Sequence, residues 1–196
     1  MTLEQDKTQR ILDSAAELFA RLGYKKTSID DIAGMAGVGK GTIYLMCESK
    51  GDLFYQVVHR ELRAWVASIT QLLDPRQPAG DLLLTCSAAA YRYIEDHPLV
   101  RDLMLGNHAE LLPMWTGRLE DLKDAGRAHV REILRLGIRQ GEFREDLDVE
   151  QVARLLQDMQ ALGLVLGYRE KRSVEDQVAM GIVCLDMLLN GLRRRA

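Results

Sequence analysis

Apolar side chains recur at spacings of three and four residues along most of the chain, which is the periodicity of amphipathic helices. No segment shows the strict alternation of apolar and polar residues that would predict a strand. The first helix is predicted over residues 4–22 and is ended by Gly23; its apolar face consists of Ile11, Ala15, Leu18, Phe19 and Leu22. The pattern therefore predicts an all-α protein.

Capping signals divide the rest of the chain into further helices. Thr27 or Ser28 caps a second helix that Gly37 ends, and Ser49 opens a long helix that runs out at Asp74. The remaining helices are expected over residues 39–46, 80–96, 98–106, 117–140, 149–170 and 174–193. About nine helices result, and all four prolines lie between residues 75 and 113, which leaves long uninterrupted helices on either side.

The segment from Thr27 to Leu53 is typical of a helix-turn-helix. Gly37 can turn the chain with positive φ between two short helices, and Val38 and Ile43 would face inward to hold their crossing angle. Such a motif presents its second helix to the major groove of DNA.

The outer side of that second helix carries groups suited to DNA. Gly39 and Gly41 leave room for close approach of the backbone, and Lys40, Thr42 and Tyr44 would point outward with donors for phosphates or base edges. Lys50 lies near the N-terminus of the next helix, whose dipole also favours a phosphate.

Two other interpretations of the segment are weaker. A purely structural helical hairpin explains the glycines poorly, because each would weaken an ordinary packing helix by roughly 1 kcal/mol. Residues 34–40 also match the start of a phosphate-binding P-loop, but Gly41 stands where Ser or Thr would bind magnesium, and a capped helix replaces the preceding strand.

Residues 27–53, preceded by Ala15-Ala16-Glu17-Leu18-Phe19 and by Gly23-Tyr24, resemble the DNA-binding domain of the tetracycline-repressor (TetR) family of transcriptional regulators. The resemblance covers about the first quarter of the chain. It implies a three-helix reader domain over residues 1–50 that extends into the helix starting near residue 50. It also implies a helical ligand-binding and dimerisation domain over residues 51–196, with a homodimer formed by the last two helices.

The resemblance also implies roles for individual residues. Thr27 or Ser28 and Lys50 would contact phosphates, and Tyr44 would lie on the DNA backbone; the segment facing base edges is Lys40, Gly41 and Thr42. The chain departs from the family at Met46 and Cys47, where Tyr or His and then Phe are common. Met46 cannot donate to a phosphate, and Cys47 leaves volume for neighbours such as Phe19 or Phe54 to fill.

Composition and charge restrict the partners. The 196 residues are 47% hydrophobic and 28% charged with a net charge of −3, so DNA binding must come from a local patch rather than from bulk charge. Three widely spaced cysteines argue against a disulfide framework. The N-terminus lacks the apolar core of a signal peptide and no segment is apolar enough to span a membrane, so a cytoplasmic protein is expected.

The second half shows no catalytic or metal-binding pattern, so we expect neither an enzyme nor a cofactor nor a metal site. Aromatic, thioether and histidine side chains predict an adaptable pocket for an apolar or aromatic small molecule, although core packing explains each of them as well. The candidate ligand contacts are Trp65, Tyr91, Met104, His108, Met114, Trp115 and Met159.

Wide apolar faces on the last two predicted helices favour a two-fold dimer that reads a palindromic operator, with internal packing as the alternative. The candidate interface residues are Leu155, Met159, Leu162, Gly163, Leu166, Ile182, Leu185 and Leu189. The whole sequence thus predicts a repressor released from DNA by a small apolar or aromatic ligand. An activator or a regulator without an inducer stays open, and a helical enzyme is the weakest alternative.

Overall fold

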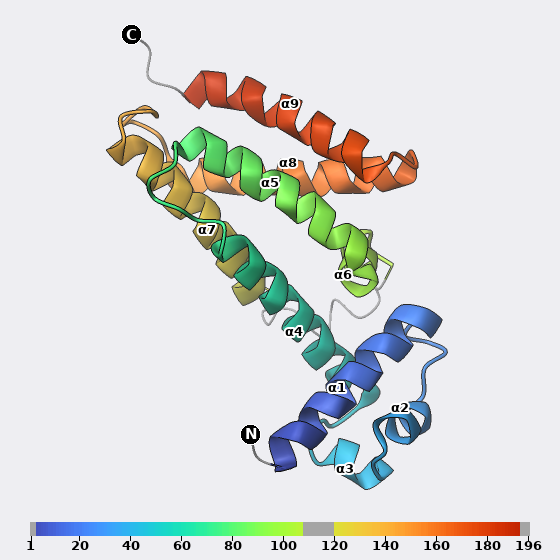
Figure 1. Ribbon diagram of the computed structural model, residues 1–196. Helices are drawn as coiled ribbons and strands as arrows, with labels where there is room; N and C mark the ends of the chain where they lie inside the picture. Colours follow the sequence, from blue (N-terminus) through green and yellow to red (C-terminus); the bar gives the residue numbers. More distant parts are fainter. Residues whose placement is uncertain (1–2, 108–119, 193–196) are drawn as a thin grey trace.

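The computed structural model describes residues 3–107 and 120–192, which form helices and no strand, as the sequence predicted. Figure 1 shows a small group of helices at one end, a bundle at the other, and one long helix that runs between them. In chain order the helices are α1 (Leu3–Leu22), α2 (Ile29–Ala36), α3 (Lys40–Tyr44), α4 (Lys50–Thr70), α5 (Ala79–Asp96), α6 (Pro98–Met104), α7 (Glu120–Arg139), α8 (Val149–Arg169) and α9 (Val174–Leu192).

Capping chemistry begins and ends the short helices of the first group. Ser28 caps α2, because its hydroxyl accepts from the Asp31 backbone N–H while the Asp31 carboxylate accepts from the Ser28 N–H. Gly37 ends α2 at φ 65°, the left-handed conformation that glycine adopts without strain. The Ser28 cap and the glycine turn are therefore confirmed.

Three helices end two or more residues earlier than predicted, one of them α6, which ends at Met104 instead of residue 106. α3 ends at Tyr44 and the chain closes it with further turns, and α4 ends at Thr70, four residues before the predicted end at Asp74. Apolar periodicity continued past both ends because side chains in the following turns, such as Cys47 and Leu73, still pack against the protein.

Two apolar cores hold the molecule together. One joins α1–α4 and continues into α5, α6, α8 and α9, and an aromatic group of Phe19, Tyr24 and Phe54 lies within it. The other lies among α5, α7, α8 and α9, around residues such as Phe143 and Leu134. Because α4 contributes Leu53 to Leu62 to the first core, its first half belongs physically to the N-terminal group.

Candidate nucleic-acid interface

The helix-turn-helix is rigidly backed. Ile43 of α3 is fully buried, Cys47 just beyond it is almost as buried, and Val38 in the turn packs partly against the same core. The Cys47 thiol donates to the carbonyl oxygen of Ile43, and burial raises its pKa. Phe19 and Phe54 belong to the same core, so the position of Cys47 is closed by packed side chains. The core therefore fixes which side of α3 faces outward.

The outer side of α3 is unobstructed. Gly39 and Gly41 are exposed, and a Cβ added at either would have no heavy atom within 4 Å. No packing contact within the described residues therefore requires glycine here. Tyr44 is 49% exposed, and Thr42 is half-buried beside it. A partner could approach this backbone closely.

Lys40 forms an ion pair on the same surface. Its Nζ lies 3.0 Å from an Asp30 carboxylate oxygen of α2, and this hydrogen bond, with the nearby charge, raises the Lys40 pKa. Both side chains are largely in water, where such a pair is weak and readily exchanged. The ammonium is thus charged and can leave Asp30 for a phosphate or a base edge.

Lys50 and Thr27, both predicted to contact phosphates, make hydrogen bonds within the protein. The Lys50 ammonium donates to the carbonyl oxygens of Tyr24 (2.9 Å) and Thr27 (3.0 Å) and lies 4.4 Å from the Tyr24 ring centroid. The Thr27 hydroxyl is buried against the carbonyl oxygens of Leu18 and Gly23. Both side chains are used to close the loop between α1 and α2, whereas Ser28 stays at the surface.

Sequence reasoning missed two residues of this region. Leu45, immediately after α3, is 89% exposed, and the Gln56 amide of α4 donates to the carbonyl oxygen of Met46, 2.9 Å away. The hydropathy pattern could not reveal the first because an apolar residue is expected to be buried. The second contact joins residues ten positions apart across a turn, which no periodicity shows.

The candidate ligand contacts differ in how they are placed in the structure. Tyr91 is a packing residue and is only 5% exposed. A Cβ added at Gly163 would lie 2.6 Å from its hydroxyl oxygen, and one added at Gly181 would lie 2.7 Å from a ring carbon. Burial also raises its pKa. Its ring therefore fills the space between α5, α8 and α9, and the ligand contact predicted for it is not supported.

Trp65, Met104 and Met159 are less completely buried than Tyr91. Trp65 of α4 stacks on Tyr93 with ring centroids 6.2 Å apart, and its indole N–H is buried without a hydrogen-bond acceptor. Met104 is half-buried against the first core, and Met159 is half-buried on α8. Three further candidates, His108, Met114 and Trp115, lie outside the described residues.

The predicted dimer face is partly internal. Leu185 and Leu189 are buried within the subunit, and Gly163 is covered by Tyr91, so these three residues are not part of a free face. An exposed apolar surface does remain on α8 and α9, and we name it the α8–α9 face: Leu155, Leu162, Leu166, Met180, Ile182, Val183 and Met187. The candidate interface therefore consists of the exposed apolar side chains of α8 and α9 and not of the buried ones. The helix periodicity of the sequence could not tell the inward apolar side of each helix from the outward one.

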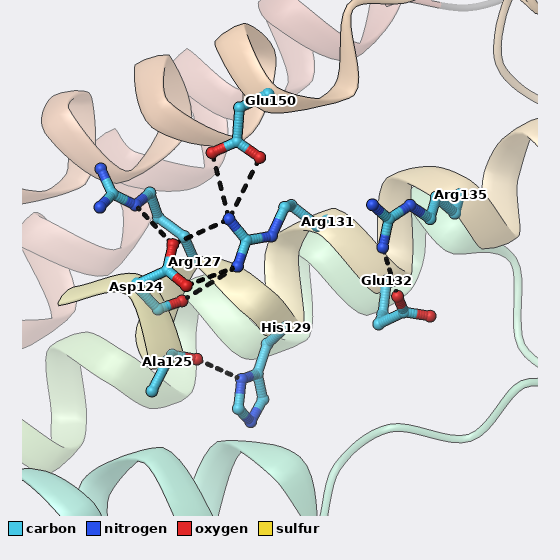
Figure 2. A network of polar contacts seen from close by, with 8 residues as sticks. All are labelled: Asp124, Ala125, Arg127, His129, Arg131, Glu132, Arg135 and Glu150. Atoms are coloured by element: carbon cyan, nitrogen blue, oxygen red, sulfur yellow. Dashed lines mark hydrogen bonds and ion pairs between the residues drawn. The ribbon is translucent and has the colours of Figure 1, made fainter. Parts of the chain in front are cut away.

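A polar network ties α7 to its neighbours (Figure 2). The Arg131 guanidinium, with a side chain only 15% exposed, bridges Asp124 at 2.9 Å and Glu150 of α8 at 3.1 Å. This lowers the pKa of Asp124. His129 lies between the carbonyl oxygen of Ala125 and the hydroxyl of Thr70 on α4. These contacts connect α7 to α8 on one side and to α4 on the other.

The described residues contain neither a candidate metal cluster nor a membrane-spanning helix. No group of three or more His, Cys, Asp or Glu side chains there could hold a metal ion. Among the described helices none has the length and apolar character needed to cross a membrane.

The chain is similar to known bacterial regulatory proteins. The family described as bacterial regulatory proteins, tetR family, matches residues 11–57. The HTH-type transcriptional repressor KstR2 of Rhodococcus jostii is 30% identical over 193 residues, which cover 93% of this chain and 89% of that protein. The fatty acid metabolism regulator protein of Bacillus subtilis is 26% identical over 197 residues and covers the whole of both chains.

Solved structures of transcriptional regulators have a similar fold. The crystal structure of the transcriptional regulator FadR from Bacillus subtilis in complex with stearoyl-CoA superposes with a TM-score of 0.69 at 21% identity, covering 95% of this chain and all of that one. These relatives are transcriptional regulators.

Proposed function

Because this chain belongs to the tetR family of bacterial transcriptional regulators and is a ligand-responsive, DNA-binding repressor, we propose that α3 enters the major groove with Lys40, Gly41, Thr42 and Tyr44 against the DNA. The observation that carries this proposal is the unobstructed outer side of α3, whose glycines face open space while Ile43 anchors the opposite side. We propose residues 1–50 with the start of α4 as the reader, and residues 51–196 as the ligand and dimer domain.

Gly41→Leu tests the placement of α3. The free protein has room for the new side chain, so folding is expected to be unimpaired, whereas a leucine would hold the backbone away from DNA. Operator duplexes are first selected from random DNA with the wild-type protein, and binding is then measured by fluorescence anisotropy. Gly191→Leu, at another exposed glycine with open space, is the matched control. Equal binding by all three proteins would contradict the placement.

The two-fold dimer is proposed to form through the α8–α9 face. Seven large apolar side chains lie exposed there on two adjacent helices, which is the kind of patch that marks a protein interface. An isologous dimer places two copies of α3 so that they read a palindrome. DNA affinity then depends on the distance between the two readers, because both half-sites must be met together.

The effector is proposed to be a long-chain acyl-CoA. Support comes from the relative named for fatty acid metabolism and from the related fold that holds stearoyl-CoA. The unpaired indole N–H of Trp65 supports a ligand with a carbonyl group, because a buried donor without an acceptor costs free energy until one arrives. Trp65 lies on α4, so a ligand held there acts directly on the helix that enters the reader.

Release of DNA provides the test for the effector. Stearoyl-CoA, coenzyme A alone and stearate alone are titrated into the protein–operator complex while anisotropy is recorded. We expect release by stearoyl-CoA only, and a weaker response in Trp65→Phe, which keeps an aromatic ring but lacks the N–H. Wild-type protein that ignores stearoyl-CoA would refute the acyl-CoA proposal without affecting the DNA assignment.

A further inference from the structure

Leu45 stands at the tip of the reader with almost its whole side chain in water. It is 89% exposed, more than any other large apolar residue in the described part of the chain. Its backbone N–H donates to the carbonyl oxygen of Gly41 at 3.1 Å, so the residue continues the turn of α3 and its position is fixed. A leucine that is both fixed and uncovered is costly in water and favourable only when something apolar covers it.

Helix geometry places Leu45 on the DNA-facing side. Successive residues turn about 100°, so Leu45 points about 200° away from Ile43, which is fully buried. Cys47, two residues further on, is buried as well. Gly41 lies one turn before Leu45 on the same side and carries no side chain, so nothing from that position shields the leucine. Leu45 is therefore continuous with the surface proposed to meet the major groove.

The major groove offers one apolar group among its base edges, the C5-methyl of thymine; the others are hydrogen-bond donors and acceptors. Phosphates on either side are charged and give leucine no favourable contact. We propose that Leu45 reads a thymine methyl in each half-site and so determines specificity at that base pair. This inference rests on the proposed placement of α3, and it adds a contact of different chemistry from the polar contacts of Lys40 and Thr42.

The experiment replaces single thymines by deoxyuridine, which removes the methyl group and keeps every hydrogen-bonding group. On the operator selected with wild-type protein, substitution at the contacted position is expected to weaken binding about fourfold in one half-site and about fifteenfold in both, the effect of burying one methyl group each time. In Leu45→Ala, binding to the thymine operator falls by a similar factor, and the deoxyuridine substitution has no further effect.

Leu22→Ala is the matched control, because this leucine is also exposed in the reader but ends α1 away from α3 (Figure 1). It should keep wild-type affinity and the wild-type deoxyuridine penalty. The inference is overturned if deoxyuridine weakens wild-type binding at no thymine position, or if Leu45→Ala still shows the full loss of affinity on deoxyuridine substitution. It is also overturned if Leu45→Ala weakens binding to the thymine operator and to the deoxyuridine operator by the same factor, larger than the loss that deoxyuridine causes in the wild type. If selection enriches no sequence, both the placement of α3 on DNA and this inference are overturned. If an operator is selected but its binding does not depend on Leu45, only this inference is overturned.

Discussion

Gln56 of α4 donates a hydrogen bond from its side-chain amide to the backbone carbonyl oxygen of Met46, 2.9 Å away. Met46 is the second residue after α3, and α4 continues to Thr70. Arg60, one turn further along α4, pairs with Asp13 of α1 at 2.7 Å. The same helix thus holds both the segment that follows α3 and the scaffold helix α1, so we expect it to couple the proposed ligand site to the proposed DNA-binding surface.

Gln56→Ala should weaken operator binding although this side chain is not proposed to touch DNA. Loss of the bond to Met46, together with the longer 3.4 Å contact of the same amide to the Asp52 carboxylate, is expected to lower the free energy of unfolding by about 0.5–1.5 kcal/mol and to loosen the turn after α3. DNA affinity is measured by anisotropy and stability by urea denaturation. Gln160→Ala is the control, since its amide makes the same kind of bond to the Ser87 carbonyl far from the reader. If both variants bind DNA like the wild type, the Gln56 contact has no positioning role.

Lys40→Ala and Lys50→Ala should separate DNA contact from loop closure. Lys40→Ala is expected to leave stability nearly unchanged, because Lys40 pairs with the exposed Asp30, and to weaken DNA binding by about 1–3 kcal/mol with relaxed sequence preference. Lys50→Ala is expected to lower the free energy of unfolding by about 1–3 kcal/mol, because two carbonyl oxygens lose a charged donor.

The salt dependence of binding distinguishes the two interpretations of Lys50. A phosphate contact, as the sequence suggests, would make the variant's affinity less sensitive to salt. A structural role leaves the slope of affinity against salt unchanged for the molecules that remain folded. Unfolding that is identical for Lys50→Ala and wild-type protein would argue against the structural role.

The reader could be predicted closely from sequence because its signals are local. The Ser28 cap, the positive φ of Gly37 and the inward Ile43 each depend on residues within a few positions of one another. The ligand half could be predicted only as helices. Whether Tyr91 meets a ligand depends on Gly163 and Gly181, which are far away in sequence and whose missing side chains leave room for its ring.

Apolar periodicity also could not divide the last two helices into inner and outer sides. Leu185 and Ile182 lie three residues apart on α9, yet the first is buried and the second is 38% exposed. The difference comes from α5, which covers one side of α9. Such coverage is a property of tertiary packing, so the interface could be predicted in location but not residue by residue.

Leu162→Glu should convert the proposed dimer to monomers. Leu162 is 58% exposed on the α8–α9 face, so a charge buried there in the dimer interface would be costly while the isolated subunit stays folded. Sedimentation equilibrium measures the mass, and anisotropy should show operator affinity reduced by at least about tenfold, because one reader must then bind alone. Leu72→Glu, also at an exposed leucine but outside this face, is the control. A wild-type protein that sediments as a monomer would refute the interface.

Tyr168 should make stability depend on pH in the alkaline range. Burial, with a 2.6 Å hydrogen bond from its hydroxyl to the Glu95 carboxylate, raises the pKa of Tyr168 to about 12. The unfolded phenol titrates near pH ~10, so the folded state holds this proton more tightly. Its stabilising contribution is therefore complete below pH ~10 and is lost as the pH rises through about 12. Urea denaturation of wild-type protein and Tyr168→Phe across this range isolates the effect, because the other tyrosines are common to both. The difference in their free energies of unfolding should shrink as pH rises. A difference that stays constant would show that the hydrogen bond from Tyr168 of α8 to Glu95 of α5 does not stabilise the fold through the protonated phenol.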